Sequence, residues 1–367
     1  MNGIRIPSRL LTASNSLAAA ALLGSTVFSR SRGARWMPEV EQREVDGREA
    51  DLYVPPGPPA PGIVLALGAL REGRRYPILE STARAIAACG FAVLVPELGR
   101  LRRLILGVDA LDELVEATRY LPSLKGALDA PVGLIGFSLG GSLALLAAGD
   151  ERVRERVACV AAMGSYFRLT DMLDAAVSGF TGPRGTTMTL AAPSAYAIAA
   201  SLADRLAEQD RRVLFDVIDR QPESPLEALS RLDSSSVGPT GRLVLELLRT
   251  RDRKQRDSLI ESVPGLAQLM ATLSPERVID SIDVPTWVMH DERDQYVPFT
   301  EFRALREAAA GRDNFTFLGI RLLEHTEPAA PNFNPRALFG DYLPGLSSLF
   351  RFVRGPIGAV RRAATRP

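Results

Sequence analysis

Ser138 lies in a short motif that is typical of catalytic nucleophiles. Residues 136–140 read GFSLG, which fits G-x-S-x-G, with an apolar run before it at 132–135 and another after it up to Ala148. This context predicts a strand, a sharp turn and a helix, and such a turn exposes the serine hydroxyl above the sheet edge. Glycines two positions away on either side remove side chains that would collide in the turn. The motif therefore predicts a nucleophilic serine; the alternative is an ordinary strand–helix turn with an incidental serine.

The base that activates this serine must come from one of two histidines. A serine hydroxyl is a weak nucleophile at neutral pH, and histidine is the usual partner because its pKa lies near the operating pH. Both histidines follow Ser138 in the chain. His325 falls in a loop after the last predicted strand, whereas His290 ends a strand, where histidines are often structural. We expect His325 to be the base.

The acid that orients the base is expected in the segment HDERDQYVP at 290–298. A carboxylate in this role holds the imidazole in the correct tautomer and stabilises its charged form. Asp294 precedes a predicted helix and lies at the tip of a loop that can reach the histidine loop. Asp291 is the second candidate, and it can instead turn the chain through its own hydrogen bond to the backbone. With Asp294, the three candidate residues follow one another along the chain in the order Ser, Asp, His.

Backbone donors are expected to hold the oxyanion that a serine attack would create. One is the N–H of Leu139, directly after the nucleophile. The other should come from the loop after the apolar run 63–67, where Ala69 is the first choice and Leu70 the alternative. Three arginines follow this loop, Arg71, Arg74 and Arg75. They could bind a substrate carboxylate or phosphate, but a solvated loop is the expectation.

The remaining pattern predicts an α/β fold with a mostly parallel sheet. Apolar runs of strand length alternate with helical patterns, which is typical of βαβ units. Strands are expected at 63–67, 91–95, 132–135, 157–163, 286–289 and 315–320, helices at 77–89, 111–121, 138–148, 300–309 and 337–353, and one or two edge strands within 37–61. Between 165 and 280 only helical patterns occur. The predicted core is therefore 37–164 with 281–356, and 165–280 is a helical cap inserted into it.

Both ends of the chain differ from this core. Residues 10–28 carry no charge and are flanked by arginines, which is typical of a signal peptide or membrane anchor within a segment 1–36. Polar residues dilute the stretch, so a soluble helix or flexible tail is the alternative. We expect export or membrane association, with membrane contact through residues 10–28. The Arg-rich stretch 357–367 is expected to be a solvated basic tail.

Composition narrows the classes of function. The 44 basic and 43 acidic side chains give a formal net charge of +1, so charge gives no reason to expect a nucleic-acid partner. Two cysteines in apolar surroundings, Cys89 and Cys159, are expected to be buried free thiols. With only two histidines, a His/Cys zinc site is not expected. Phosphate-binding glycine motifs are absent from the sequence, and no cofactor is predicted.

Four segments together resemble α/β hydrolases of the dienelactone-hydrolase-related and esterase branch. The resemblance covers 60–165 and 283–326 and rests on the segments around ALGAL, GFSLGG, HDERDQYVP and EHTEP. It implies an eight-stranded sheet, a catalytic triad and cofactor-free hydrolysis of esters, thioesters or related acyl bonds. A serine replaces the cysteine nucleophile of dienelactone hydrolases, and Leu67-Gly68 stands where His-Gly is usual, which leaves the substrate open. The leading hypothesis is cleavage of a small-molecule or lipid-like carboxylic ester. The alternatives are a thioesterase or acyltransferase, and a non-catalytic binding protein on this fold.

Overall fold

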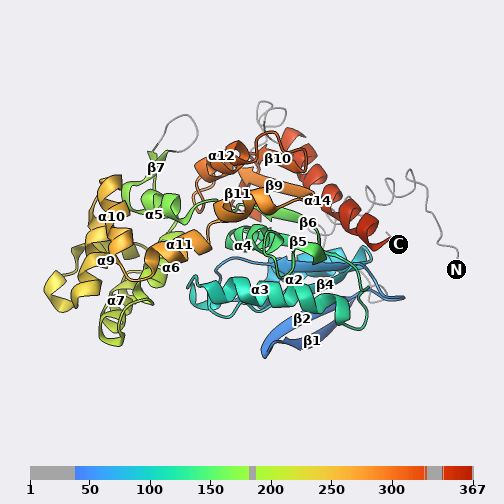
Figure 1. The fold of residues 1–367 in the computed structure, drawn as a ribbon, viewed down its shortest axis with the longest axis horizontal. Helices are drawn as coiled ribbons and strands as arrows, with labels where there is room; N and C mark the ends of the chain where they lie inside the picture. The colour runs from blue at the N-terminus through green and yellow to red at the C-terminus, as the bar shows by residue number, and fades with distance from the viewer. Residues whose placement is uncertain (1–37, 182–186, 326, 329–340, 342, 366–367) are drawn as a thin grey trace.

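An eight-stranded sheet forms the centre of the molecule (Figure 1). The computed structural model describes residues 38–181, 187–325, 327–328, 341 and 343–365. The strand order is β1-β2-β4-β3-β5-β6-β9-β10. The edge pair β1 and β2 is antiparallel, β2 is antiparallel to β4, and the other pairs are parallel. The strands are β1 (Glu39–Val45), β2 (Arg48–Val54), β3 (Gly62–Ala66), β4 (Ala92–Pro96), β5 (Val132–Phe137), β6 (Val157–Met163), β9 (Thr286–Asp291) and β10 (Phe315–Ile320).

Helices cover both faces of the sheet, which explains why its central strands are continuous apolar runs. Every residue of β3 and β4 is buried. One face packs against α3 (Val108–Tyr120), α4 (Leu139–Ala148) and α12 (Phe299–Ala308), and the other against α2 (Pro77–Ala88) and α14 (Leu343–Ala364). The predicted α/β architecture with edge strands in 37–61 is confirmed.

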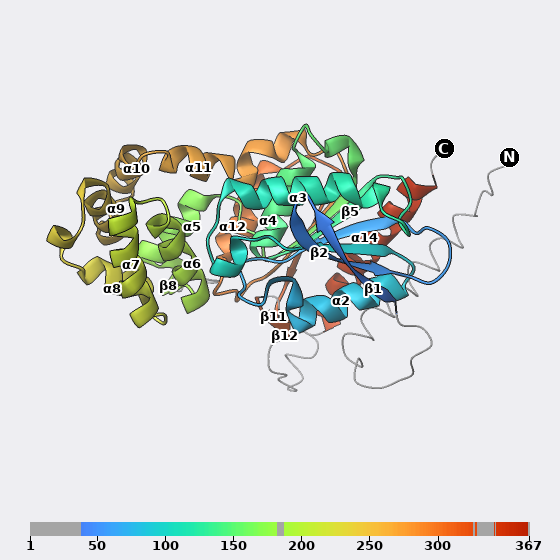
Figure 2. The ribbon, with the colours of Figure 1, turned by 90° about the horizontal axis from the view of Figure 1, so that it is seen from below.

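The chain between β6 and β9 forms a separate group of helices beside the sheet (Figures 1 and 2). This group, called the cap below, has a buried apolar cluster of its own. One feature was not predicted: a short antiparallel pair, β7 (Phe180–Thr181) with β8 (Thr187–Met188). The cap helices are α5 (Leu169–Ser178), α6 (Ala192–Ala203), α7 (Glu208–Arg220), α8 (Pro225–Arg231), α9 (Pro239–Arg249), α10 (Arg253–Ser262) and α11 (Leu266–Thr272).

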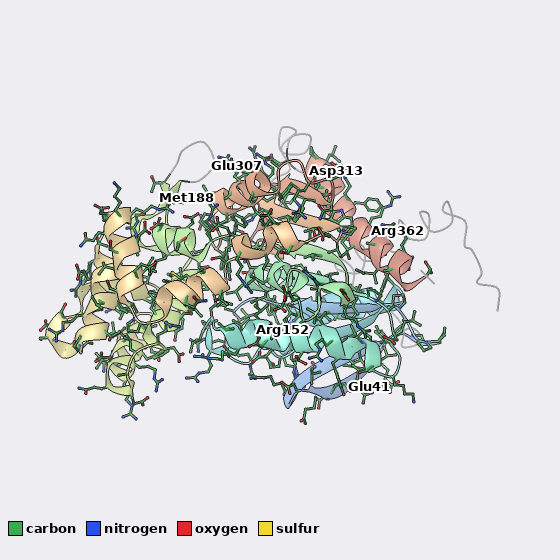
Figure 3. All side chains as sticks on the ribbon, in the orientation of Figure 1. Glu41, Arg152, Met188, Glu307, Asp313 and Arg362 are labelled. Carbon is green, nitrogen blue, oxygen red and sulfur yellow. The ribbon has the colours of Figure 1, made fainter. Side chains whose placement is uncertain are left out.

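The prediction of a solvated basic tail at 357–367 is wrong for residues 357–365, the part of that stretch that the structure describes. Helix α14 continues to Ala364, and Ile357 and Val360 are buried against the sheet. A Cβ added to Gly133 of β5 would lie 2.6 Å from a methyl group of Val360, so the glycine makes room for the helix. Apolar residues on one side of the helix anchor it, while Arg362 is exposed on the side of the molecule away from the cap (Figure 3).

Two further expectations concern the N-terminus and the cysteines. The segment 10–28 lies outside the described residues, and among the helices that are described none is long and apolar enough to cross a membrane. The two cysteines are not joined by a disulfide. Cys159 is buried as predicted, whereas Cys89, at the end of α2, is only half-buried.

Candidate active site

Ser138 occupies a strained turn between β5 and α4. Its backbone has φ 55° and ψ −131°, a conformation that a residue with a side chain rarely adopts. The two flanking glycines are required by close packing: a Cβ on Gly136 would lie 2.2 Å from the carbonyl oxygen of Gly140, and one on Gly140 would lie 2.6 Å from that of Ala66. The serine N–H donates to the carbonyl oxygen of Met163 at 2.7 Å. The turn is thereby fixed to the neighbouring strand, with the serine at the start of a helix.

Asp294 and His325 are hydrogen-bonded in the same region. His325 Nδ1 lies 2.6 Å from Asp294 Oδ2, and both residues are buried. The other carboxylate oxygen, Oδ1, accepts hydrogen bonds from the N–H groups of Tyr296 at 2.8 Å and Val297 at 3.0 Å. Burial acts to raise the pKa of Asp294, but hydrogen bonds from His290 and His325 outweigh it and hold that pKa well below its usual range. The carboxylate is therefore ionised and fixed in direction.

Asp291, the alternative acid, has a different set of partners. Its Oδ1 accepts from the N–H of Arg293 at 2.9 Å, which is the turn-forming bond expected from the sequence. Its Oδ2 accepts from the N–H of Leu322 at 2.7 Å. Asp291 thus ties the loop after β9 to the loop after β10, and these two loops carry Asp294 and His325.

His290 is a second histidine beside Asp294, and this contact was not predicted from the sequence. Its Nε2 lies 2.9 Å from the carbonyl oxygen of Val297 and 3.3 Å from Asp294 Oδ2, and the side chain is fully buried. Its Nδ1 is buried without a hydrogen-bond partner. Burial lowers the pKa of His290, but the hydrogen bond and negative charge of Asp294 raise it overall. The only signal in the sequence was the spacing of four residues between the two.

Two residues after strand ends shape the surroundings of His325. The ring of Tyr296 stacks on the imidazole, with centroids 4.6 Å apart and planes at 17°. Gly164 follows β6 with φ +63°, and a Cβ there would lie 3.0 Å from His325 Cε1 and 3.2 Å from Nδ1. A larger residue would push the imidazole away from Asp294. In the sequence, Gly164 was identified only as the last residue of the predicted core segment 37–164.

A buried carboxyl group supports the segment that follows Gly164. Glu301, at the start of α12, accepts hydrogen bonds from the N–H groups of Phe167 and Arg168, both at 2.8 Å. It is 1% exposed. Burial raises the pKa of Glu301 to about 7, although the two N–H donors act in the opposite direction. The segment from Gly164 to the cap is therefore anchored to the core by one titratable side chain.

The predicted oxyanion loop passes directly beside the nucleophile. A Cβ added to Gly68 would lie 3.1 Å from the backbone N of Leu139 and 3.1 Å from Ser138 Oγ. The next two residues, Ala69 and Leu70, line the same cavity as Ser138 and His325. Space for a reacting group beside both a nucleophile and an N–H donor is what an acyl-transfer site requires.

Of the three arginines after this loop, Arg74 does not fit the expected solvated loop. It is 5% exposed and binds Asp51 through Nη1 at 3.1 Å, with Glu49 also in contact through Nη2. The arginines suggested a surface loop because the acidic partners of Arg74 lie in other parts of the chain: Asp51 and Glu49 on β2, and Glu97 directly after β4. Arg71 and Arg75 are exposed, and the Arg71 guanidinium lies over the ring of Tyr196 in the cap, 5.3 Å from its centroid.

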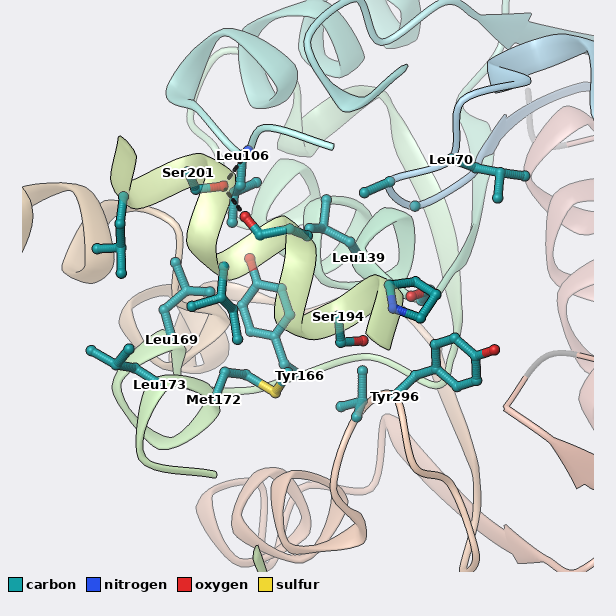
Figure 4. A pocket seen from close by; sticks show the side chains of 18 of the residues that line it. Leu70, Leu106, Leu139, Tyr166, Leu169, Met172, Leu173, Ser194, Ser201 and Tyr296 are labelled. Atoms are coloured by element: carbon teal, nitrogen blue, oxygen red, sulfur yellow. Dashed lines mark hydrogen bonds between the residues drawn. The ribbon is translucent and has the colours of Figure 1, made fainter. Parts of the chain in front are cut away.

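A cavity of about 330 Å³ lies between the core and the cap and contains Ser138 and His325. Its lining in the described chain includes no Asp, Glu, Lys or Arg. Helices α5, α6 and α11 supply much of the wall, largely with leucine, methionine, isoleucine and alanine. Figure 4 shows this wall, with Tyr296 at one end and Leu169 and Leu173 at the other. A concave apolar site with a few polar groups is typical of small-molecule binding.

The strand order and the turn at Ser138 define the class: the chain has the α/β-hydrolase fold, and solved structures match it. A puromycin-hydrolyzing peptidase of Mycobacterium tuberculosis matches at TM-score 0.53 and 14% identity, over 91% of this chain and 40% of its own. An α/β hydrolase of Penicillium sp. matches at TM-score 0.48 and 15% identity, over 87% and 98%. An esterase of Pyrococcus furiosus matches at TM-score 0.44 and 13% identity, over 87% and 98%.

The match to the mycobacterial peptidase concerns the fold alone, because the identity is low. The chain spans less than half the length of the mycobacterial peptidase. No protein-family model and no curated protein matches the sequence.

Proposed function

We propose that this protein is a serine hydrolase that cleaves a carboxylic ester through an acyl-enzyme on Ser138. The observation that carries the proposal is the 2.6 Å hydrogen bond between Asp294 and His325. His325 lines a cavity together with Ser138, which lies on a strained turn between a strand and a helix. Because Nδ1 of His325 is hydrogen-bonded to Asp294, the other ring nitrogen, Nε2, is the one that would accept the serine proton.

The proposed reaction follows from these positions. Ser138 Oγ attacks the ester carbonyl while His325 Nε2 takes its proton. The N–H groups of Leu139 and Ala69 bind the oxyanion of the tetrahedral intermediate. His325 then gives the proton to the departing alcohol, and the acyl group stays on the serine. A water molecule then attacks the acyl-enzyme while His325 takes its proton. As the bond between the acyl carbon and Ser138 Oγ breaks, His325 returns the proton to Oγ and the carboxylic acid leaves.

The cavity lining supports an uncharged substrate. A substrate with an ammonium or carboxylate group inside the cavity would lose hydration without gaining a side chain of opposite charge, which is costly. The described lining offers no such partner. An ester or thioester with an apolar acyl group meets this condition, whereas a peptide with a free N-terminus bound in the cavity does not.

The test is a matched set of substrates that share one acyl group and differ in the bond cleaved: oxygen ester, thioester and amide. We expect the oxygen ester to give the highest kcat/KM and Ser138→Ala to lower it at least about 10³-fold. A thioester turned over far faster than its oxygen ester would assign the protein to the thioesterases. Equal turnover by wild type and Ser138→Ala, with both folded, would contradict the proposal.

A further inference from the structure

The geometry of the cavity distinguishes the two halves of an ester substrate. In the proposed reaction His325 protonates the leaving alcohol, so the alcohol must depart on the side of the imidazole. Tyr296 stacks on that imidazole and therefore marks the alcohol side. From there the cavity extends under the cap, to Leu169 and Leu173 at the opposite end (Figure 4). The long arm of the cavity thus lies on the acyl side.

Two polar side chains along this arm, Ser201 and Tyr166, are already hydrogen-bonded within the protein. Ser201 Oγ donates to the carbonyl oxygen of Ala197 at 2.6 Å and accepts from the N–H of Leu106 at 2.9 Å. The hydroxyl of Tyr166 donates to the carbonyl oxygen of Leu273 at 2.8 Å. Because these groups have partners, an aliphatic chain can lie against them without breaking a hydrogen bond.

We infer that the arm of the cavity under the cap binds a medium-length, uncharged aliphatic acyl chain, and that Leu169 and Leu173 of α5 limit its length. This inference rests on the proposed function, because it assigns the acyl half of that reaction. Leu173 is 1% exposed and belongs to the buried cluster of the cap, so this end wall is held by packing.

The size of the cavity sets the expected chain length. A water molecule takes about 30 Å³ in the liquid, and a methylene group is of similar size. The 330 Å³ cavity therefore has room for on the order of ten carbon atoms. Burying one methylene contributes about 0.8 kcal/mol, which corresponds to about fourfold in kcat/KM for each added carbon.

Helix α6 offers a matched pair of substitutions to test the site. Ser194, Ala197 and Ser201 line the cavity about one turn apart, with Ser194 nearer to Tyr296 and Ser201 toward the far end (Figure 4). Ala197→Phe therefore places a ring in the middle of the arm. Ala195 is half-buried on the same helix and does not line the cavity, so Ala195→Phe makes the same chemical change elsewhere.

The experiment measures kcat/KM for p-nitrophenyl esters from acetyl to dodecanoyl, with wild type and both variants. In wild type we expect kcat/KM to rise several-fold per methylene and to fall before the acyl chain reaches about ten carbons, because the alcohol side takes up part of the 330 Å³ cavity. Ala197→Phe is expected to lower the octanoyl-to-acetyl ratio at least tenfold, and Ala195→Phe to keep the wild-type ratio. Thermal unfolding confirms that both variants are folded.

Two further measurements distinguish a failure of this inference from a failure of the proposed function. A small fluorophosphonate is applied to every protein, and a second ester series keeps the acetyl group and lengthens the alcohol. Labelling of wild type with a flat acyl profile, or a gain only in the alcohol series, would overturn the acyl assignment and leave the hydrolase intact. An equal loss in Ala195→Phe would overturn it as well. Absence of labelling in wild type would remove the proposed function itself.

Discussion

Replacing Gly68 by alanine tests the oxyanion site with a single methyl group. The added Cβ would lie 3.1 Å from the Leu139 N–H donor and 3.1 Å from Ser138 Oγ, where the polarised carbonyl of a substrate must fit. Loss of one oxyanion-hole donor costs about 3–4 kcal/mol, or about 10²–10³ in kcat. We expect Gly68→Ala to lower kcat by that factor. Fold stability should change little, because Gly68 does not adopt a positive φ and its tightest contact, 3.0 Å, is to the serine side chain.

The assay compares kcat and KM of wild type, Gly68→Ala and Gly319→Ala on one activated ester, with unfolding in urea as the stability measurement. Gly319 is a matched control, because its nearest neighbour to an added Cβ is a ring atom of Phe299 at 3.7 Å. The control is expected to retain wild-type kcat. If Gly68→Ala keeps kcat within threefold of wild type while remaining folded, the methyl group does not obstruct the reaction, and the loop 68–70 is not the oxyanion loop.

Three other sets of substitutions test the proposed acid Asp294, the buried carboxyl group of Glu301, and the buried ion pair between Arg74 and Asp51. Asp294→Asn should lower kcat by about 10³–10⁴, whereas Asp291→Asn should lower it less than tenfold; steady-state kinetics that reverse this order would make Asp291 the acid. Burial raises the pKa of Glu301 from 4.5 to about 7, so the folded state binds this proton more tightly than the unfolded state. The protonated Glu301 therefore stabilises the fold fully below pH 4.5, and this contribution is lost as the pH rises through about 7. Urea unfolding from pH 4 to 8 should show wild type losing on the order of 3 kcal/mol relative to Glu301→Gln, and parallel curves would refute this. Arg74→Met should destabilise the fold by about 3 kcal/mol because the buried carboxylate of Asp51 loses its buried partner and keeps the exposed Arg75, whose Nε lies 3.9 Å away. Asp51→Asn in the same chain should restore part of the loss; a change below about 1 kcal/mol in urea would show that the ion pair contributes little.

The elements that position the site were predictable because they are apolar runs of strand or helix length. The strand 132–135, the turn at Ser138 and the strand 157–163 follow from local pattern, and the structure contains them as β5, the turn and β6. Burial on both faces of a parallel sheet leaves such a signal in consecutive residues. The bond between Asp294 and His325 was also expected, from the order of motifs along the chain.

What the sequence did not reveal depends on contacts between distant segments. The arginine run at 71–75 looks like a surface loop, and only the fold brings Arg74 to Asp51 on β2. The contact of His290 with Asp294 arises from the way the loop after β9 folds back on its strand. Gly164 adopts φ +63°, and His325, far away in sequence, packs against it, so both its backbone and its surroundings require glycine. The arginines near the C-terminus suggested a solvated tail, but the apolar residues between them form one face of α14, which packs on the sheet through Val360.

The most direct test of the central claim is covalent labelling of the serine. Purified protein is treated with a fluorophosphonate, beside Ser138→Ala and His325→Ala, and the modified residue is identified by mass spectrometry. An activated serine predicts labelling at Ser138 in wild type, none in Ser138→Ala and at least a 10²-fold slower reaction in His325→Ala. Folded wild type that does not react, or labelling at another residue that survives both substitutions, would contradict the proposed nucleophile and the mechanism built on it.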